Sequence, residues 1–146
     1  VVEYSDAKTP IEAAQIKYKN NELKDAASKC RQAMESISYN LWNKISQSSN
    51  GQISVAMRTP KTQPDLYSIV DALIKKTKTM SGMESIRDNL QEIKKTDNWR
   101  VLNKGVHFED EQQEFERDDI KCVLDILIEL DNQVRNIKIQ NIASVY

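Results

Sequence analysis

The sequence predicts an all-α protein, a helical bundle of four to five main helices with one long irregular loop at about residues 47–64. Apolar residues recur at steps of three and four over long stretches, which is the period of an amphipathic helix. Helix-start signals precede these stretches. Only three Gly and three Pro among 146 residues leave few turns. The length suits a single domain over residues 1–146, with 1–8 as an arm and 139–146 as a tail.

The first two helices follow from their start signals. Thr9 can cap a helix over residues 10–19, with Pro at its first position and Glu12 closing a capping box. We expect its inward side chains to be Ile11, Ala14 and Tyr18. Asn21 then caps a helix over residues 22–46, which has the longest apolar stripe of the chain: Leu23, Ala26, Ala27, Cys30, Ala33, Met34, Ile37, Leu41 and Ile45. Arg31 and Glu35 are spaced as an i,i+4 ion pair on its polar face.

The middle of the chain combines a basic loop with a third helix. Arg58 and Lys61 make the 47–64 loop basic, so it is either a plain connector or a binding loop. A helix over residues 65–79 follows, with Leu66, Ile69, Val70, Leu73 and Ile74 inward. Three lysines crowd its last turn, where the helix dipole favours cations. Alternatively, these three lysines form a patch that faces phosphate.

Three more helices are predicted in the second half. Ser81 and Glu84 form a capping box for a helix over 82–95, with Met83, Ile86, Leu90 and Ile93 inward. Asp97 caps a short helix over 98–104 that buries Trp99 and Leu102, and Gly105 is placed to end it. After an acidic run comes a helix over 114–138, whose stripe is Ile120, Val123, Leu124, Leu127, Leu130, Val134 and Ile137. Ile126 and Ile128 widen this stripe, so the helix is either central or covered by another subunit.

Composition excludes several classes of protein. There are 21 basic and 22 acidic residues, which argues against a general nucleic-acid coat protein but not against a local basic patch. With one His and no C-x-x-C, no structural zinc site is expected, and we predict no cofactor. Cys30 and Cys122 both fall in helical patterns and are expected to be small buried residues.

No apolar run approaches the ~20 residues of a membrane span, so we expect no membrane and a cytoplasmic protein. Val at position 1 suggests excision from a larger protein.

The chemistry-bearing residues gather between Trp99 and Phe108. Walker A, dinucleotide-binding and nucleophile-elbow motifs are absent from the sequence. Arg100, Asn103 and His107 would share one face of a continuous helix, although a helix ending at Gly105 would leave the imidazole just past its end. A ribonuclease that needs no metal requires a base for the ribose 2′-OH and a cation for the charge on phosphate. Arg100, Asn103 and His107 are the candidate catalytic residues. Lys104, Arg58 and Lys61 are candidate RNA contacts. A buried polar cluster that orders a helix end is the alternative.

The chain resembles the HEPN superfamily, all-α domains that include ribonucleases of toxin, anti-phage and CRISPR systems. The family motif is Arg, four to six residues, then His, and six residues separate Arg100 from His107. The segment 14–42 is similar to the first helix pair of such domains. The segment 102–107, with the acidic run and long helix after it, is similar to C-terminal domains of P-loop ATPases in bacterial anti-phage defence. Two features depart from the family: Val101 stands where a polar residue is common, and Gly105 and Val106 interrupt the motif.

The resemblance implies a homodimer in which the motifs of two subunits face each other. It also implies a P-loop ATPase domain in the same or a partner chain. The first hypothesis is therefore a metal-independent endoribonuclease acting on single-stranded or loop RNA, such as a tRNA anticodon. Arg100 would hold phosphate, His107 would transfer protons and Asn103 would orient either one. The second hypothesis is a non-catalytic dimerisation or docking module of an ATPase-linked defence protein, in which the same residues belong to a polar core.

Overall fold

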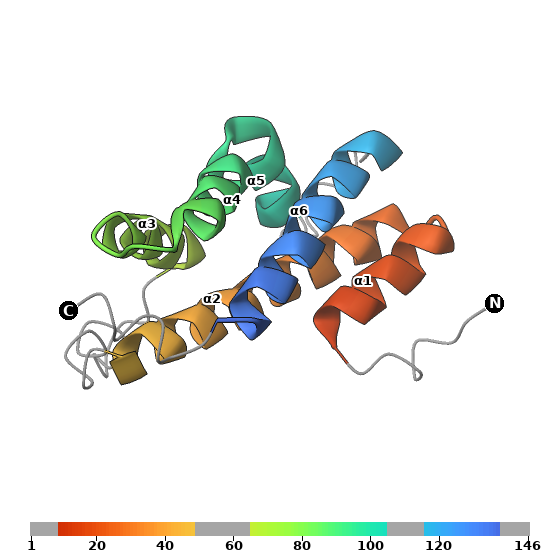
Figure 1. The fold of residues 1–146 in the computed structure, drawn as a ribbon. Coiled ribbons are helices and arrows are strands. Elements are labelled where there is room, and N and C mark those ends of the chain that lie inside the picture. Colours follow the sequence, from red (N-terminus) through yellow and green to blue (C-terminus); the bar gives the residue numbers. More distant parts are fainter. Residues whose placement is uncertain (1–8, 49–64, 105–115, 138–146) are drawn as a thin grey trace. The chain divides into compact units, whose positions relative to one another are not determined.

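The computed structural model describes residues 9–48, 65–104 and 116–137, and within these ranges all regular structure is helical. The all-α prediction is confirmed. Six helices are described (Figure 1): α1 Pro10–Lys19, α2 Leu23–Ser48, α3 Leu66–Thr77, α4 Glu84–Lys94, α5 Thr96–Lys104 and α6 Arg117–Arg135. Each predicted helix is present, with ends that differ by a few residues. Residues 49–64 of the predicted loop, the predicted arm and the predicted tail lie outside the described residues.

The chain divides into two compact units. The first comprises Val1–Ser36 and Glu92–Glu129, and the second comprises Ile37–Gln91 and Leu130–Tyr146. Helices α2, α4 and α6 each contribute residues to both units. The single domain over residues 1–146 stays a prediction.

In the first unit, α1 and the beginning of α2 form a helical hairpin (Figure 1). Thr9 caps α1 as predicted, its hydroxyl oxygen accepting from the Glu12 N–H at 3.2 Å. Asn21 does not cap α2, because it adopts φ 61° in the turn, a left-handed conformation that Asn tolerates. Its side chain instead accepts a hydrogen bond from Arg117 Nη1 at 2.9 Å. The turn therefore uses Asn21 to end one helix and to contact the start of α6.

The face of α1 that is buried differs from the predicted one. Ala13 and Ala14 are the buried residues of this helix, whereas Ile11 and Tyr18 are only half-buried. The beginning of α2 also has small buried residues, Ala26 and Ala27. Small side chains let helix backbones approach closely, which suits a hairpin whose buried α1 residues are alanines.

In the second unit, individual residues determine where helices begin and bond to the backbone groups at their ends. Asp65 caps α3, accepting from the Ser68 N–H at 2.7 Å. The predicted start of α4 was two residues too early, because Gly82 has φ +83° and cannot be helical, so α4 begins at Glu84. Lys44 caps the far end of α6, its Nζ donating to the carbonyl oxygens of Val134 at 2.6 Å and Arg135 at 3.2 Å. A cation at a helix C-terminus also meets the negative end of the dipole.

The apolar stripes are confirmed with few exceptions. Leu23 and Ile137 are half-buried, and the other stripe residues predicted for α2, α3, α4 and α6 are buried. Ile126 and Ile128 are half-buried. Cys30 is buried as expected, but Cys122 is exposed. The prediction for Cys122 was wrong because it lies beside the stripe of α6, one position before the buried Val123.

Candidate functional site

Helix α5 carries the described part of the predicted catalytic motif on its solvent face. Its buried positions are Asn98, Trp99, Val101 and Leu102. Its exposed positions are Thr96, Asp97, Arg100 and Asn103, which recur at helical spacing and so form one face. The buried Asn98 amide is satisfied within the fold, since its Nδ2 donates to the Glu92 carbonyl oxygen at 2.9 Å. The core contacts of α5 therefore fix which way Arg100 and Asn103 face.

Arg100 presents its positive charge to solvent. It is exposed, and among the described residues no hydrogen bond or ion pair involves its guanidinium group. Asp97 lies on the preceding turn of the same face without pairing to it. A guanidinium with several free N–H donors is suited to bidentate recognition of a phosphate or carboxylate.

Asn103 is joined to a residue that the motif did not include. Arg31, on α2, donates from Nη1 to the Asn103 Oδ1 at 3.4 Å, a long hydrogen bond. The Nε of the same guanidinium donates to Glu35 Oε1 at 3.1 Å, which confirms the predicted i,i+4 pair. Asn103 itself is exposed. The structure thus brings Arg31 from α2 to the α5 face that carries Arg100.

Four of the predicted site residues have no described side-chain position. His107, Arg58 and Lys61 lie outside the described residues, and for Lys104, the last residue of α5, the side chain is not described. The two predicted residues that are described, Arg100 and Asn103, lie one turn apart. Their proximity to His107, which the hypothesis of catalysis needs, stays a prediction.

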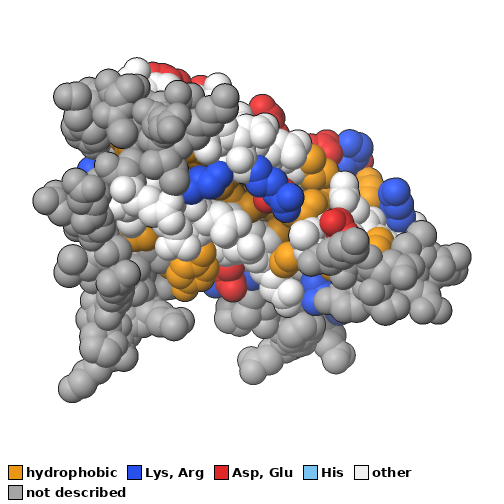
Figure 2. Space-filling view, turned by 60° about the horizontal axis from the view of Figure 1, so that its bottom comes forward, with side chains coloured by type: hydrophobic (Ala, Val, Ile, Leu, Met, Phe, Trp, Pro, Cys, Tyr) orange, Lys and Arg blue, Asp and Glu red, His pale blue; other side chains and the backbone are white. Residues whose placement is uncertain are grey.

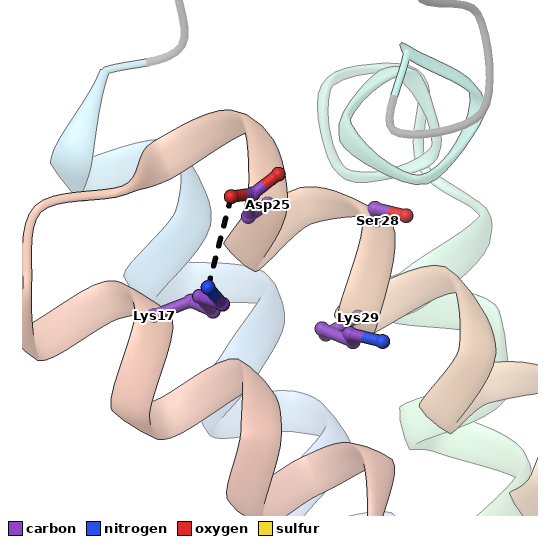
Figure 3. A pocket seen from close by; sticks show the side chains of 4 residues that line it. All are labelled: Lys17, Asp25, Ser28 and Lys29. Carbon is purple, nitrogen blue, oxygen red and sulfur yellow. Dashed lines mark ion pairs between the residues drawn. The ribbon is translucent and has the colours of Figure 1, made fainter. Parts of the chain in front are cut away.

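A shallow hollow in the first unit is a second candidate (Figure 3). It has a volume of about 290 Å³ and is lined by Lys17 of α1 and by Asp25, Ser28 and Lys29 of α2. Lys17 pairs with Glu22 at 3.1 Å and with Asp25 at 3.8 Å, so its charge is already matched. Pockets for organic ligands typically measure ~300–1,000 Å³. This small hollow, in which Lys17 is already paired with carboxylates, is therefore a weaker candidate than the α5 face.

The wider surface agrees with the near-zero net charge. On the coloured part of the face drawn in Figure 2, basic and acidic side chains are interspersed with uncharged ones, and neither sign covers a large continuous area. Among the residues that the structure describes, no group of His, Cys, Asp and Glu is arranged to hold a metal ion. None of the described helices is both long enough and apolar enough to cross a membrane.

Comparisons with protein-family models, with curated proteins and with solved structures find no match to this chain. The resemblance to HEPN domains consequently stays a prediction based on residues 14–42 and on the spacing of Arg100 and His107.

Proposed function

We propose that this chain is a HEPN-like domain that binds single-stranded RNA on the solvent face of α5 and cleaves it without a metal ion. The observation that supports the proposal best is the exposed Arg100, whose guanidinium has no counterion among the described residues. RNA offers such a group a row of phosphates, and base-independent binding of nucleic acids depends mainly on phosphate contacts. Asn103 adds an amide one turn further along the same face.

The proposed reaction is transfer of the phosphoryl group to the neighbouring ribose oxygen. His107, which enters from the sequence alone, removes the proton of the 2′-OH, and O2′ attacks phosphorus as the bond to O5′ breaks. A second copy of the chain supplies the proton that the leaving oxygen takes up. The products are a 2′,3′-cyclic phosphate and a 5′-hydroxyl. Arg100 stabilises the negative charge that grows on the non-bridging oxygens, and an imidazole that titrates near neutrality suits the proton transfer.

The test is cleavage of a labelled single-stranded RNA by the full chain in the presence of EDTA. We expect wild type to produce 2′,3′-cyclic phosphate ends and His107→Ala to lose at least ~100-fold in rate, the lower range for one acid–base group. Lys19→Gln is the control, because Lys19 is an exposed cation on α1 and is not part of the motif. Equal rates for wild type and His107→Ala would rule out the proposed catalysis.

A non-catalytic docking module is the competing proposal, and one observation favours it. Val101 follows the motif Arg and is only 3% exposed, so the position where HEPN ribonucleases commonly have a polar residue belongs to the core here. A module of this kind would form a dimer in analytical ultracentrifugation yet leave RNA intact. RNA cleavage that is lost in His107→Ala would exclude it.

A further inference from the structure

The contact between Arg31 and Asn103 determines which atoms of the Asn103 amide face solvent. A guanidinium has only N–H donors and no acceptor, so the amide atom that meets it at 3.4 Å has to be the carbonyl oxygen. The two N–H groups of Nδ2 then lie on the other side of the amide. No described residue accepts from them. The α5 face therefore presents donors from both Arg100 and Asn103.

We infer that Arg31 is a positioning residue that turns the Asn103 amide with its donors outward, so that this face binds phosphate oxygens and does not read the bases. This inference rests on the proposed RNA-binding function. Phosphate oxygens are acceptors only, and two donor groups one turn apart match them. Reading adenine with Asn would require its oxygen as acceptor together with its N–H as donor. Arg31 already donates to that oxygen and so turns it toward α2, away from an incoming base.

Glu35 and the fold hold Arg31 in place. The Arg31 side chain is 20% exposed, and its Nε is paired with Glu35 at 3.1 Å on the next turn of α2. Because the guanidinium is planar and rigid, fixing Nε also limits the directions of the Nη groups. The Glu35 carboxylate balances the Arg31 charge, whereas no described residue pairs with the Arg100 charge on α5. Arg31 thus acts through Asn103, and Arg100 supplies the attraction for the anion.

The charges of α5 limit where on this helix a phosphate can bind. Asp97 is exposed on the turn before Arg100 and would repel an anion there. The negative end of the helix dipole lies at the other end, near Lys104, so backbone dipoles do not attract an anion to this position. Side-chain donors have to provide the binding, and the position between Arg100 and Asn103 is the one with donors on both sides.

The deciding variant is Asn103→Asp. A carboxylate keeps the acceptor that Arg31 needs but removes both N–H donors and places a negative charge beside Arg100. We expect affinity for oligouridylate, measured by fluorescence anisotropy on the full chain, to fall at least about tenfold, with the thermal midpoint unchanged or raised. Lys19→Gln, which removes an exposed charge on α1, should bind within about twofold of wild type.

Variants of Arg31 separate positioning from simple loss of charge. Arg31→Lys keeps a donor for the Asn103 oxygen and should retain wild-type affinity within about threefold. Arg31→Met lets the amide turn, so its affinity for oligouridylate should fall and its preference for oligoadenylate should rise above that of wild type, which we expect to bind both equally. Circular dichroism melting verifies that both variants are folded.

The outcomes distinguish this inference from the proposed function. If Arg100→Gln weakens RNA binding while Asn103→Asp binds as wild type does, the inference is overturned and RNA binding by α5 stands. A wild-type preference for adenine that Arg31→Met does not alter also overturns it. If wild type binds neither oligonucleotide, the proposed function and the inference are both wrong.

Discussion

Arg31 and Arg100 carry the same charge in the first unit, yet their surroundings give them different roles. Arg31 is held by Glu35 and Asn103, whereas Arg100 is exposed without a partner among the described residues. The spacing of four residues predicts the pairing of Arg31 with Glu35. Nothing in the sequence predicts its contact with Asn103, because the two residues are 72 positions apart and meet only when α2 and α5 pack. The partner of a side chain was therefore predictable where both residues lie on the same helix.

The two cysteines show the same limit of residue-scale prediction. Both lie in helical patterns, but a residue is buried only if it lies on the face of its helix that meets the core. Cys30 is buried, whereas Cys122 is exposed. Burial raises the pKa of the Cys30 thiol from 9.0 to about 12, because the thiolate would have to be desolvated. This thiol is consequently a packing group in the native state and a poor nucleophile.

Cys30 should make the protein less stable at alkaline pH. Its pKa is raised in the folded state, so its contribution is fully present below pH 9.0 and is lost as the pH rises toward about 12. At a pH one unit above 9.0, the loss from this group amounts to ~1.4 kcal/mol of unfolding free energy. Urea denaturation at pH 8 and pH 10 measures this loss of unfolding free energy.

The comparison uses Cys30→Ala, with the exposed Cys122→Ala as its matched control. We expect Cys30→Ala to lose about 1.4 kcal/mol less than wild type between the two pH values. Identical losses in wild type and Cys30→Ala would contradict the effect of burial on this thiol.

At the scale of the helices, local signals predict existence and approximate bounds, while the precise ends depend on backbone conformation. The predicted cap at Thr9 is confirmed, because a short side chain bonds to a nearby N–H of its own chain. Asp65 caps α3 in the same way, although the predicted helix began at this residue. The sequence predicts helix starts at Asn21 and Gly82, but both residues have positive φ. An Asn or Gly between two helices can end the first or start the second, and sequence alone does not distinguish these uses.

Arg117 joins the start of α6 to the α1–α2 turn, and its removal should destabilise the protein. Its Nη1 donates to the Tyr18 carbonyl oxygen at 3.1 Å and to Asn21 Oδ1 at 2.9 Å. The guanidinium carbon also lies 4.1 Å from the centre of the Tyr18 ring. We expect Arg117→Ala to lower the free energy of unfolding by ~1–2 kcal/mol, from hydrogen bonds and a solvent-exposed cation–π contact.

Chemical denaturation of Arg117→Ala gives this value, and Arg117→Lys is the matched control. Lys keeps the charge near the ring but cannot reproduce the guanidinium geometry, so it should recover only part of the loss. Wild-type stability in Arg117→Ala would show that the contact contributes nothing to the docking of α6.

At the scale of the whole molecule, the fold class was predictable because helical periodicity is a local property that long stripes repeat many times. The buried residues of α2, α4 and α6 follow that period almost without exception. The short α1 was less predictable, since its buried residues are alanines and its larger side chains lie at an edge. The candidate site was half predictable: spacing identified Arg100 and Asn103, and tertiary packing added Arg31.

The proposed RNA binding requires Arg100 on α5 to contact the phosphate backbone. The most direct test is the affinity of the full chain for a single-stranded RNA, measured over a series of salt concentrations for wild type and Arg100→Gln. Each phosphate contact contributes about 0.7 to the slope of log affinity against log salt for single strands. We predict that Arg100→Gln weakens binding about tenfold and lowers the slope by about 0.7. Coincident lines for the two proteins, or no binding by wild type at low salt, would contradict RNA binding through Arg100.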